Sequence, residues 1–281
     1  MMEFDNLDGF LCGKGDKLFD TSNRVLKYGD GIFETIKLAN GKLMFWEDHF
    51  NRLNKDAEYL GMEISGKDVA FWKKEVEKVI VKNYYKNARI RVIVYRDSPG
   101  LYTPMGNRLS FLIEGTRFDK PEYSFNSKGI KLGVFTRDQK GISPLNNIKT
   151  TSALLFVLAG KYKKEQGLDD VIVLNTHGRV CESVSSNVFV VKDDTIYTPK
   201  LSEGCLDGVM RKQIIKAIHQ KGLSFEESEV TLEDLSTADE IFLTNVMSGV
   251  QGVTEFQGKR LRDTYTINFQ AHLENALLEA Y

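Results

Sequence analysis

Lys149 and Glu182 are the residues of this chain whose types could do chemistry together. A lysine at the end of a structural element can be partly desolvated, which lowers the pKa of its amine and frees it to attack a carbonyl carbon. A buried carboxylate needs a cationic or hydrogen-bonding partner, and a protonated pyridine nitrogen is such a partner. If both side chains face one pocket, they indicate an aldehyde cofactor with a heterocyclic ring.

Each of these two residues also has a plainer interpretation. Lys149 lies in a polar segment just before an apolar helix, and most lysines in such segments are solvated. Glu182 lies in a strand-like segment, where a glutamate at a sheet edge commonly faces water. The small residues that follow it, 183–186, are unusual for a structural strand and suggest that another group approaches closely.

Arg52 offers a contact for an anion. It lies in an amphipathic helix beside Phe50 and Leu53, and a guanidinium can donate two parallel hydrogen bonds to a phosphate. The alternative is a surface salt bridge with Asp48 or Asp56, each four positions away. Without further context, the salt bridge is the simpler interpretation.

Two other segments have the character of ligand loops. Gly208 opens a predicted helix, so free backbone N–H groups at the helix start can approach an anion. Thr244 and Asn245 end a buried-type strand, and polar side chains at such strand ends often meet a ligand. Each signal alone also fits an ordinary turn.

Strands and helices must position these residues, and hydrophobic periodicity predicts both types of element in each half of the chain. In the first half we predict strands at 28–38, 41–46, 90–95 and 109–114, with helices from about 48 to 61 and at 69–84. In the second half we predict strands at 130–136, 171–174, 179–191, 195–199, 225–230 and 241–244, with helices at 150–166, 208–221 and 263–280. Hairpin turns in both halves argue against an all-parallel sheet, so we expect a mixed α/β fold.

A polar segment around Pro121 predicts a boundary between two domains. We expect a small α/β domain over residues 1–118 and a linker over 119–125. A larger α/β domain over 126–281 would carry Lys149.

The charge balance argues against two classes of partner. With 38 basic and 39 acidic side chains, the chain lacks the basic character expected for binding nucleic acid or a membrane surface. Its longest apolar run, 153–159, is far too short to span a bilayer. Three scattered cysteines favour a reduced, cytoplasmic setting, and four scattered histidines lack zinc-ligand spacing, so we expect no metal site.

Six segments, taken in order, resemble the class IV aminotransferases, which are the fold-type IV pyridoxal-phosphate enzymes. These segments read YGDGIFET at 28–35, HFNRL at 49–53, IKT at 148–150, ESVSSNVF at 182–189, TP at 198–199 and LDGVMR at 206–211. Each segment alone is a weak signal. Six in the right order over nearly the whole chain are specific.

The resemblance implies two α/β domains with pyridoxal 5'-phosphate in the cleft between them, and a homodimer in which a partner loop closes the site. It implies that Lys149 forms the Schiff base and later moves the proton at the substrate α-carbon, while Glu182 pairs with the pyridine nitrogen. The implied phosphate contacts are Arg52, the backbone N–H groups of Val209 and Met210, and Thr244 or Asn245.

Two departures from the family pattern affect ligand recognition. Met210 stands where many relatives have threonine, so only its backbone N–H remains for the phosphate. Leu101 stands where many relatives carry an arginine for the substrate carboxylate. Arg96, Tyr102 or a residue of a partner chain would have to compensate, and we predict Phe33, Arg96 and Tyr102 as substrate contacts.

Three branches of the family compete: branched-chain aminotransferase, D-amino-acid aminotransferase and aminodeoxychorismate lyase. All act on an amino-acid-type substrate through an external aldimine. Branched-chain enzymes usually have Gly-Thr-Ala where Asn245 and Val246 stand, whereas Thr244-Asn245 followed by an apolar pair resembles the lyase. We therefore expect 4-amino-4-deoxychorismate lyase, an enzyme of folate biosynthesis that releases pyruvate and 4-aminobenzoate.

Two alternatives remain open. The first is an amino-acid transaminase acting on branched-chain or D-amino acids. The second is a protein that binds a phosphate ligand without catalysis, which the presence of both Lys149 and Glu182 disfavours.

Overall fold

The computed structural model describes residues 2–119 and 121–278. It divides into two compact units, the first made of Met1–Pro121 and Lys149–Ser152 and the second of Glu122–Ile148 and Ala153–Tyr281. The sequence placed Lys149 in the second domain, whereas its segment belongs to the first unit in the structure. Lys120, inside the predicted linker 119–125, and residues 279–280 of the last predicted helix lie outside the described residues.

The first unit contains a six-stranded sheet in the order β2-β1-β6-β5-β3-β4, with every neighbouring pair antiparallel. Successive side chains of a strand point to opposite faces, so Ile32, Glu34 and Ile36 share one face of β3 and Phe33 lies on the other. The strands are β1 (Phe4–Leu7), β2 (Phe10–Gly13), β3 (Gly31–Ala39), β4 (Lys42–Leu43), β5 (Ala88–Arg96) and β6 (Leu109–Arg117).

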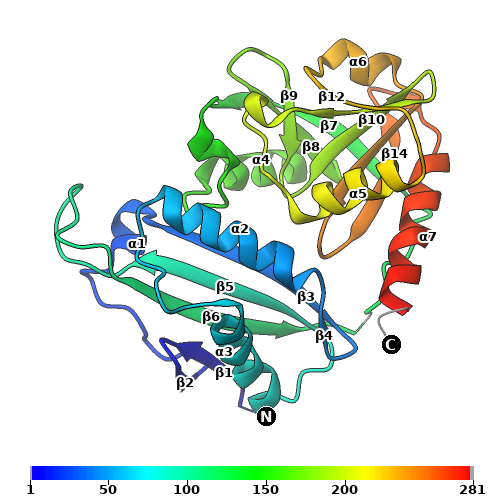
Figure 1. The fold of residues 1–281 in the computed structure, drawn as a ribbon. Helices are drawn as coiled ribbons and strands as arrows, with labels where there is room; N and C mark the ends of the chain where they lie inside the picture. The colour runs from blue at the N-terminus through cyan, green and yellow to red at the C-terminus, as the bar shows by residue number, and fades with distance from the viewer. Residues whose placement is uncertain (1, 120, 279–281) are drawn as a thin grey trace. The chain divides into compact units, whose positions relative to one another are not determined.

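Three helices complete this unit: α1 (Arg24–Tyr28), α2 (Trp46–Tyr59) and α3 (Val69–Lys82). Figure 1 shows α2 running along the sheet beside β3 and β5. Phe50, Leu53 and Ala57 recur at helical spacing on α2 and are all buried, which confirms the predicted amphipathic helix. The helix thereby carries Arg52 into the interior of the unit.

Two predicted strands of the first unit are wrong at their boundaries. Tyr28 ends α1 instead of starting a strand, because Gly29 takes a left-handed conformation with φ of 65° and ends the helix there. The strand predicted at 41–46 is confined to Lys42–Leu43, and α2 begins soon after it.

The second unit contains a nine-stranded mixed sheet. Its order is β12-β11-β10-β13-β14-β7-β8-β9, with β15 also paired to β14. The pairs β11–β12, β14–β7 and β7–β8 are parallel and the others are antiparallel. The strands are β7 (Ile130–Lys140), β8 (Asp170–Asn175), β9 (Val180–Ser183), β10 (Asn187–Lys192), β11 (Thr195–Pro199), β12 (Phe225–Ser228), β13 (Glu240–Asn245), β14 (Gly249–Phe256) and β15 (Lys259–Arg260).

The helices of the second unit are η1 (Pro144–Asn147), α4 (Leu154–Glu165), η2 (Leu201–Glu203), α5 (Val209–Gln220), α6 (Leu232–Thr237) and α7 (Thr264–Leu278). The helix predicted to begin at Thr150 begins at Leu154, because the residues before it pair with β3 of the first unit. Thr231 and Asp234 form a capping box at the start of α6, with both reciprocal hydrogen bonds present.

Buried aliphatic side chains of the mixed sheet and of α6 form one core of this unit, including Ile172, Val188, Leu235 and Ile241. Antiparallel pairs occur in both units, so the predicted mixed α/β fold class is confirmed. Within residues 2–119 and 121–278, no helix combines the length and the apolar character needed to cross a bilayer.

Candidate active site

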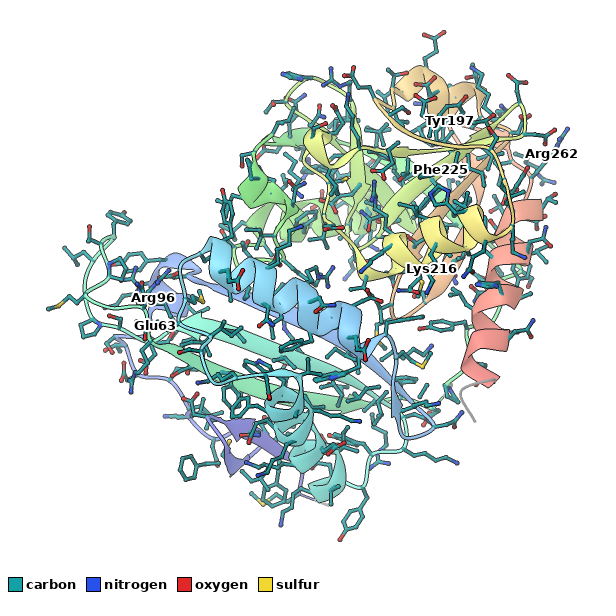
Figure 2. The ribbon with its side chains drawn as sticks, viewed as in Figure 1. Glu63, Arg96, Tyr197, Lys216, Phe225 and Arg262 are labelled. Carbon is teal, nitrogen blue, oxygen red and sulfur yellow. The ribbon has the colours of Figure 1, made fainter. Side chains whose placement is uncertain are left out.

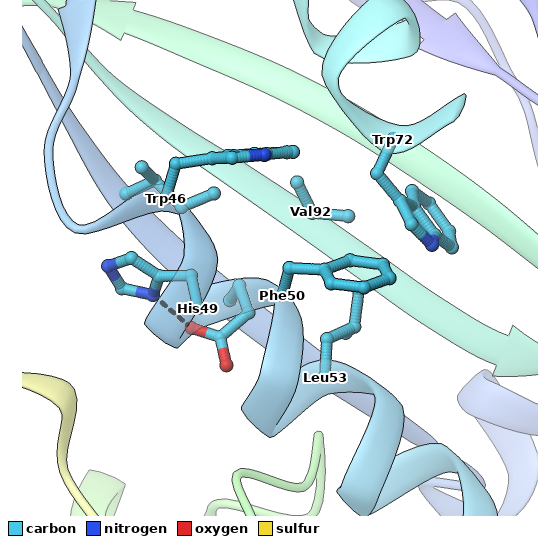
Figure 3. Close-up of a pocket in the computed structure, with 8 residues that line it drawn as sticks. Trp46, His49, Phe50, Leu53, Trp72 and Val92 are labelled. Atoms are coloured by element: carbon cyan, nitrogen blue, oxygen red, sulfur yellow. Dashed lines mark hydrogen bonds and ion pairs between the residues drawn. The ribbon is translucent and has the colours of Figure 1, made fainter. Parts of the chain in front are cut away.

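Arg52 belongs to a buried charged cluster of the first unit. Its Nε donates to Glu34 Oε1 at 2.7 Å, and its Nη2 donates to Glu34 Oε2 at 2.6 Å. His49 Nδ1 lies 2.7 Å from the same Oε2, and the dashed line in Figure 3 marks this contact. All three side chains are buried, so Arg52 is an interior cation with a fixed carboxylate partner.

Electrostatics set the protonation of this cluster. Burial alone would raise the pKa of Glu34, but the charges and hydrogen bonds of Arg52 and His49 hold it at about 2. Burial lowers the pKa of His49; Glu34 opposes this shift, and the charges of Arg52 and Lys149 add to it. At neutral pH the cluster therefore contains a carboxylate, a guanidinium and a neutral imidazole.

A small cavity lies between α2 and the sheet beside this cluster (Figure 3). Its volume of about 10 Å³ leaves room for about one water molecule. The side chains that line it include Trp46, Phe50, Leu53, Trp72 and Val92. The cavity is a packing gap, because it is far too small for a cofactor or an amino acid.

Lys149 lies in a short segment that pairs with the Gly31 end of β3. The Phe33 N–H donates to the Lys149 carbonyl and the Thr151 N–H donates to the Gly31 carbonyl, each at 2.9 Å. The amine of Lys149 lies 4.5 Å from the centre of the Phe33 ring. The structure therefore brings together the predicted Schiff-base lysine and one predicted substrate residue.

Arg91 on β5 is a neighbour of this pair that the sequence reasoning missed. Its guanidinium carbon lies 4.1 Å from the centre of the Phe33 ring, and the side chain is half-buried. Its Nε has no hydrogen-bond partner among the residues that the structure describes. Burial lowers the pKa of Arg91, opposed by Glu114 directly across the strand pair.

The loop between β5 and β6 carries the predicted substrate residue Tyr102. Leu101 and Tyr102 are 77% and 87% exposed. Arg24 on α1 holds the loop, because its guanidinium donates to the backbone carbonyls of Gly100, Leu101 and Tyr102. The backbone of this loop is thus fixed to its unit while the Tyr102 side chain is left exposed.

Arg96, the third predicted substrate residue, anchors the base of the same loop (Figure 2). It is 7% exposed. Its guanidinium donates to the side chains of Asp30 and Asn107 and to the carbonyls of Leu60 and Gly61. Its contact with a substrate stays a prediction.

Glu182 lies on β9 of the second unit, where two protein groups bind its carboxylate. Lys140 at the end of β7 donates from Nζ to Oε1, and the Leu206 N–H donates to Oε2 at 3.3 Å. Lys140 also donates to the Asn146 carbonyl at 2.8 Å. Glu182 and Lys140 are 4% and 6% exposed, so Glu182 is a buried anion beside a buried cation and does not face water.

The start of α5 is built to accept an anion. Among the residues that the structure describes, no side chain caps this 12-residue helix, and its first turn contains no acidic residue. Its first backbone N–H groups and positive dipole end are therefore available. A Cβ on Gly208 would lie 2.0 Å from Asn187 Oδ1, so only glycine allows this close approach. Val209 and Met210, whose N–H groups were predicted to hold the phosphate, form the first helical turn.

Thr244 lies beside this helix start, because its Cα pairs with Asn187 across β13 and β10. Thr244 is 1% exposed, and its hydroxyl has no hydrogen-bond partner among the described residues. A buried hydroxyl without a partner is costly in a protein interior, and a bound oxyanion would supply one.

Asn245 has a different environment. Its amide nitrogen donates to Ser186 Oγ at 2.9 Å, and its Oδ1 accepts from the N–H groups of Met247 at 3.0 Å and Ser248 at 2.9 Å. The side chain therefore shapes the turn that follows β13. Of the two residues predicted at this strand end, Thr244 is the one with an unsatisfied hydroxyl.

The predicted residues fall into two groups that the structure assembles separately. Arg52, Lys149 and Phe33 belong to the first unit, and the second unit holds Glu182, Val209, Met210, Thr244 and Asn245. The chemical types fit pyridoxal 5'-phosphate: an amine for its aldehyde, a carboxylate for its ring nitrogen, and N–H, hydroxyl and guanidinium donors for its phosphate. The sequence reasoning missed Glu34, Arg91 and Lys140.

A comparison with protein families decides the assignment. The family described as "Amino-transferase class IV" matches residues 31–256 of this chain. The chain belongs to the class IV aminotransferases. The match spans Phe33, Arg52, Lys149 and Glu182, so both groups of predicted residues fall inside it.

Known relatives of the chain include proteins of different reaction types. The chain is 27% identical over 277 residues to a D-alanine aminotransferase of Bacillus licheniformis, covering 96% of each chain. It is 29% identical over 242 residues to an aminodeoxychorismate lyase of Vibrio harveyi, covering 83% of this chain and 85% of the relative.

Solved structures share the fold. The branched-chain aminotransferase of Thermoproteus uzoniensis, solved with norvaline, superposes with a TM-score of 0.87 at 24% identity. The match covers 98% of this chain and 94% of that enzyme. Class IV aminotransferases are pyridoxal-phosphate enzymes, so the predictions of an enzyme and of this cofactor are confirmed at the level of the family.

Proposed function

We propose that this class IV aminotransferase-family enzyme is a 4-amino-4-deoxychorismate lyase. The reaction breaks the C–O bond between the ring and the enolpyruvyl side chain of its substrate. It yields pyruvate and 4-aminobenzoate, and loss of the ring proton makes the product aromatic. No second substrate is consumed, whereas a transaminase needs a keto acid to accept the amino group.

In the first unit, the amine of Lys149 would hold the cofactor covalently. It would afterwards accept the proton removed from the substrate carbon that bears the amino group. Arg52 would bind the phosphate. Its two hydrogen bonds to Glu34, at 2.7 and 2.6 Å, fix the plane of the guanidinium before any ligand arrives. Preorganised donors of this kind cost little reorganisation on binding.

In the second unit, Glu182 would bind the protonated ring nitrogen, and Lys140 would orient the carboxylate from the other side. The N–H groups of Val209 and Met210 and the hydroxyl of Thr244 would bind the phosphate. When bound, pyridoxal 5'-phosphate supplies a ring that accepts the electrons left by bond cleavage at the substrate, and the charge on Glu182 favours the protonated, electron-accepting ring.

Arg91 is our candidate for the substrate carboxylate, in place of the arginine expected where Leu101 stands. It is half-buried, its Nε is unsatisfied among the described residues, and it lies over the same Phe33 ring as the Lys149 amine. A guanidinium with an unsatisfied donor is suited to a carboxylate. Phe33, Arg96 and Tyr102 remain the contacts predicted from the sequence.

The sequence of the segment Thr244-Asn245-Val246-Met247 is the reason that we prefer the lyase to a transaminase. Asn245 accepts two hydrogen bonds within this turn and donates a third to Ser186, so a residue pattern expected for the lyase also shapes the backbone there. A transaminase is the second candidate, because the match to the D-alanine aminotransferase covers 96% of the chain. We further propose a homodimer located in the cytoplasm.

A product assay tests the choice. The holoenzyme is supplied with 4-amino-4-deoxychorismate alone, with leucine plus a keto acid acceptor, or with D-alanine plus an acceptor. We expect pyruvate and 4-aminobenzoate in equal amounts from the first mixture without any acceptor, and none with Lys149→Ala. Keto-acid formation from leucine or D-alanine, without product from aminodeoxychorismate, would replace the lyase by a transaminase.

A further inference from the structure

Asp56 is a buried carboxylate on α2 that the proposed mechanism does not use. It is 4% exposed and lies one helical turn after Arg52. Its Oδ2 accepts a hydrogen bond from the backbone N–H of Lys149 at 3.2 Å. We infer that Asp56 is a positioning residue, which holds the backbone of Lys149 so that its amine is presented for attachment of the cofactor. This inference rests on the proposed role of Lys149.

The hydrogen bonds around Lys149 show where the segment leaves the sheet. Ile32 and Thr150 form an antiparallel bridge, and the Phe33 N–H donates to the Lys149 carbonyl. In a continued antiparallel ladder, the next residues would exchange both bonds, so the Lys149 N–H would donate to the Phe33 carbonyl. It donates to Asp56 instead. Asp56 therefore sets the backbone direction at the lysine itself.

The two ends of the segment are held differently. At Thr151 the backbone N–H donates to the Gly31 carbonyl at 2.9 Å, and the hydroxyl bonds the carbonyls of Gly29 and Gly31 at 2.8 and 3.1 Å. At Lys149 the backbone N–H donates to a side chain, that of Asp56. Residues 149–152 belong to the first unit while their neighbours on both sides belong to the second, so the segment depends on such local bonds.

The charges around Asp56 favour a strong hydrogen bond at neutral pH. Arg52 and Lys55 face it from α2, Glu34 faces it from β3, and the Lys149 N–H approaches from the paired segment. Burial raises the pKa of Asp56 to about 6, while the Lys149 hydrogen bond and Arg52 oppose the rise. Asp56 is therefore mostly ionised at neutral pH, and hydrogen bonds to ionised acceptors are the stronger kind.

Three substitutions separate this role from general stabilisation. Asp56→Ala removes the acceptor, and Asp56→Asn keeps an oxygen acceptor of the same shape. Asp68→Ala is the matched control, because Asp68 also accepts one backbone N–H in the same unit, from Phe71 at 2.8 Å. Asp56→Leu, which fills the space without an acceptor, replaces the alanine variant if the latter does not fold.

The first readout is amide hydrogen exchange in the cofactor-free protein. We expect Asp56→Ala to speed exchange at the Lys149 amide about tenfold, the loss expected for one hydrogen bond to a charged group, with β5 and β6 unchanged. Asp56→Asn should stay within about threefold of the unmodified protein. Unchanged exchange in Asp56→Ala, equal loss in Asp56→Asn, or the same local change in Asp68→Ala would overturn the inference.

The second readout is the rate at which pyridoxal 5'-phosphate becomes attached, followed by absorbance. We expect about a tenfold lower rate for Asp56→Ala and a nearly normal rate for Asp56→Asn. A normal rate for Asp56→Ala would also overturn the inference. If the unmodified protein attaches no cofactor, the proposed function fails, while hydrogen exchange still decides whether Asp56 positions Lys149.

Discussion

At the scale of single residues, the candidate site is built from buried charges held in pairs. Glu34 lies against Arg52, and Glu182 lies against Lys140, with all four side chains less than a tenth exposed. Burying an ion is costly, and losing one partner of a buried pair leaves the other uncompensated. The effects of substitution should therefore be large and specific to each pair.

Replacing Arg52 should destabilise the cofactor-free protein. Arg52→Gln leaves the Glu34 carboxylate buried with His49 as its remaining neighbour in the cluster, so we expect the free energy of unfolding to fall by about 3 kcal/mol. Adding Glu34→Gln should recover part of the loss, because the uncompensated charge is gone. Urea unfolding of both single variants and the double variant measures this, and strictly additive losses would show that the two residues do not interact.

Asp56 should make the stability of the protein depend on pH. Its pKa in the folded protein is raised to about 6, so the folded state holds the proton more tightly than the unfolded state does. The stability that this proton contributes is complete below the ordinary pKa of aspartate and is lost as pH rises through 6. The free energy of unfolding of Asp56→Asn, relative to that of the unmodified protein, should therefore rise by about 2 kcal/mol as pH increases from 4 to 7. A constant difference across this range, in unfolding experiments, would contradict the raised pKa.

Glu182 should be needed for turnover more than for cofactor binding. In Glu182→Gln the amide no longer stabilises a protonated ring nitrogen, so we expect cofactor content to persist while turnover falls about 100-fold. Absorbance of the bound cofactor and product formation measure the two effects separately. Turnover equal to that of the unmodified enzyme would show that Glu182 does not hold the ring nitrogen.

At the scale of elements, the sequence predicted the helices whose apolar residues recur at helical spacing. This spacing predicted α2 and α3, and Gly208 predicted the start of α5. The pairing of Lys149–Thr151 with β3 could not be read from periodicity, because it depends on residues more than a hundred positions away. The strand predicted at 41–46 is shorter because residues 44 and 45 form a turn and α2 begins at Trp46.

The start of α5 gives a prediction at this scale. Gly208→Ala would place a Cβ 2.0 Å from Asn187 Oδ1, so the helix start must move. We expect affinity for pyridoxal 5'-phosphate to fall about tenfold or more, because the N–H groups of Val209 and Met210 are displaced. Equilibrium binding to the cofactor-free protein measures this.

Gly160→Ala in α4 is the matched control. Among the described residues, its added Cβ would contact Val184 alone, at 3.9 Å. Alanine is more favourable than glycine in a helix interior by about 1 kcal/mol. The variant should bind the cofactor normally and have a slightly higher free energy of unfolding. Equal loss of affinity in both variants would show that the effect is not specific to the helix start.

At the scale of the whole molecule, the residues predicted for the site are divided between the two compact units. The order of six short segments was enough to predict the family and the cofactor. The same segments could not show the partners of these residues: Glu34 and Lys140 were missed because a buried partner is set by tertiary packing and not by local spacing. Arg91 could have been predicted from the pairing of the two strands, because it pairs with Thr35, which shares a face of β3 with Phe33.

The reaction type also belongs to this scale. Relatives with aminotransferase and lyase names match most of the chain at similar identity, so the fold and the family are common to both chemistries. We propose that the difference lies in a few residues that contact the substrate, and Arg91 and Asn245 are our candidates. Both are open to substitution without touching Lys149 or Glu182.

The proposed role of Lys149 is tested by identifying the lysine that carries the cofactor. The protein is loaded with pyridoxal 5'-phosphate, reduced with borohydride, digested and analysed by mass spectrometry, with Lys149→Ala treated in parallel. We predict one phosphopyridoxyl group, located on Lys149 and absent from the variant. A label on another lysine, or equal labelling of Lys149→Ala, would show that Lys149 is not the attachment site.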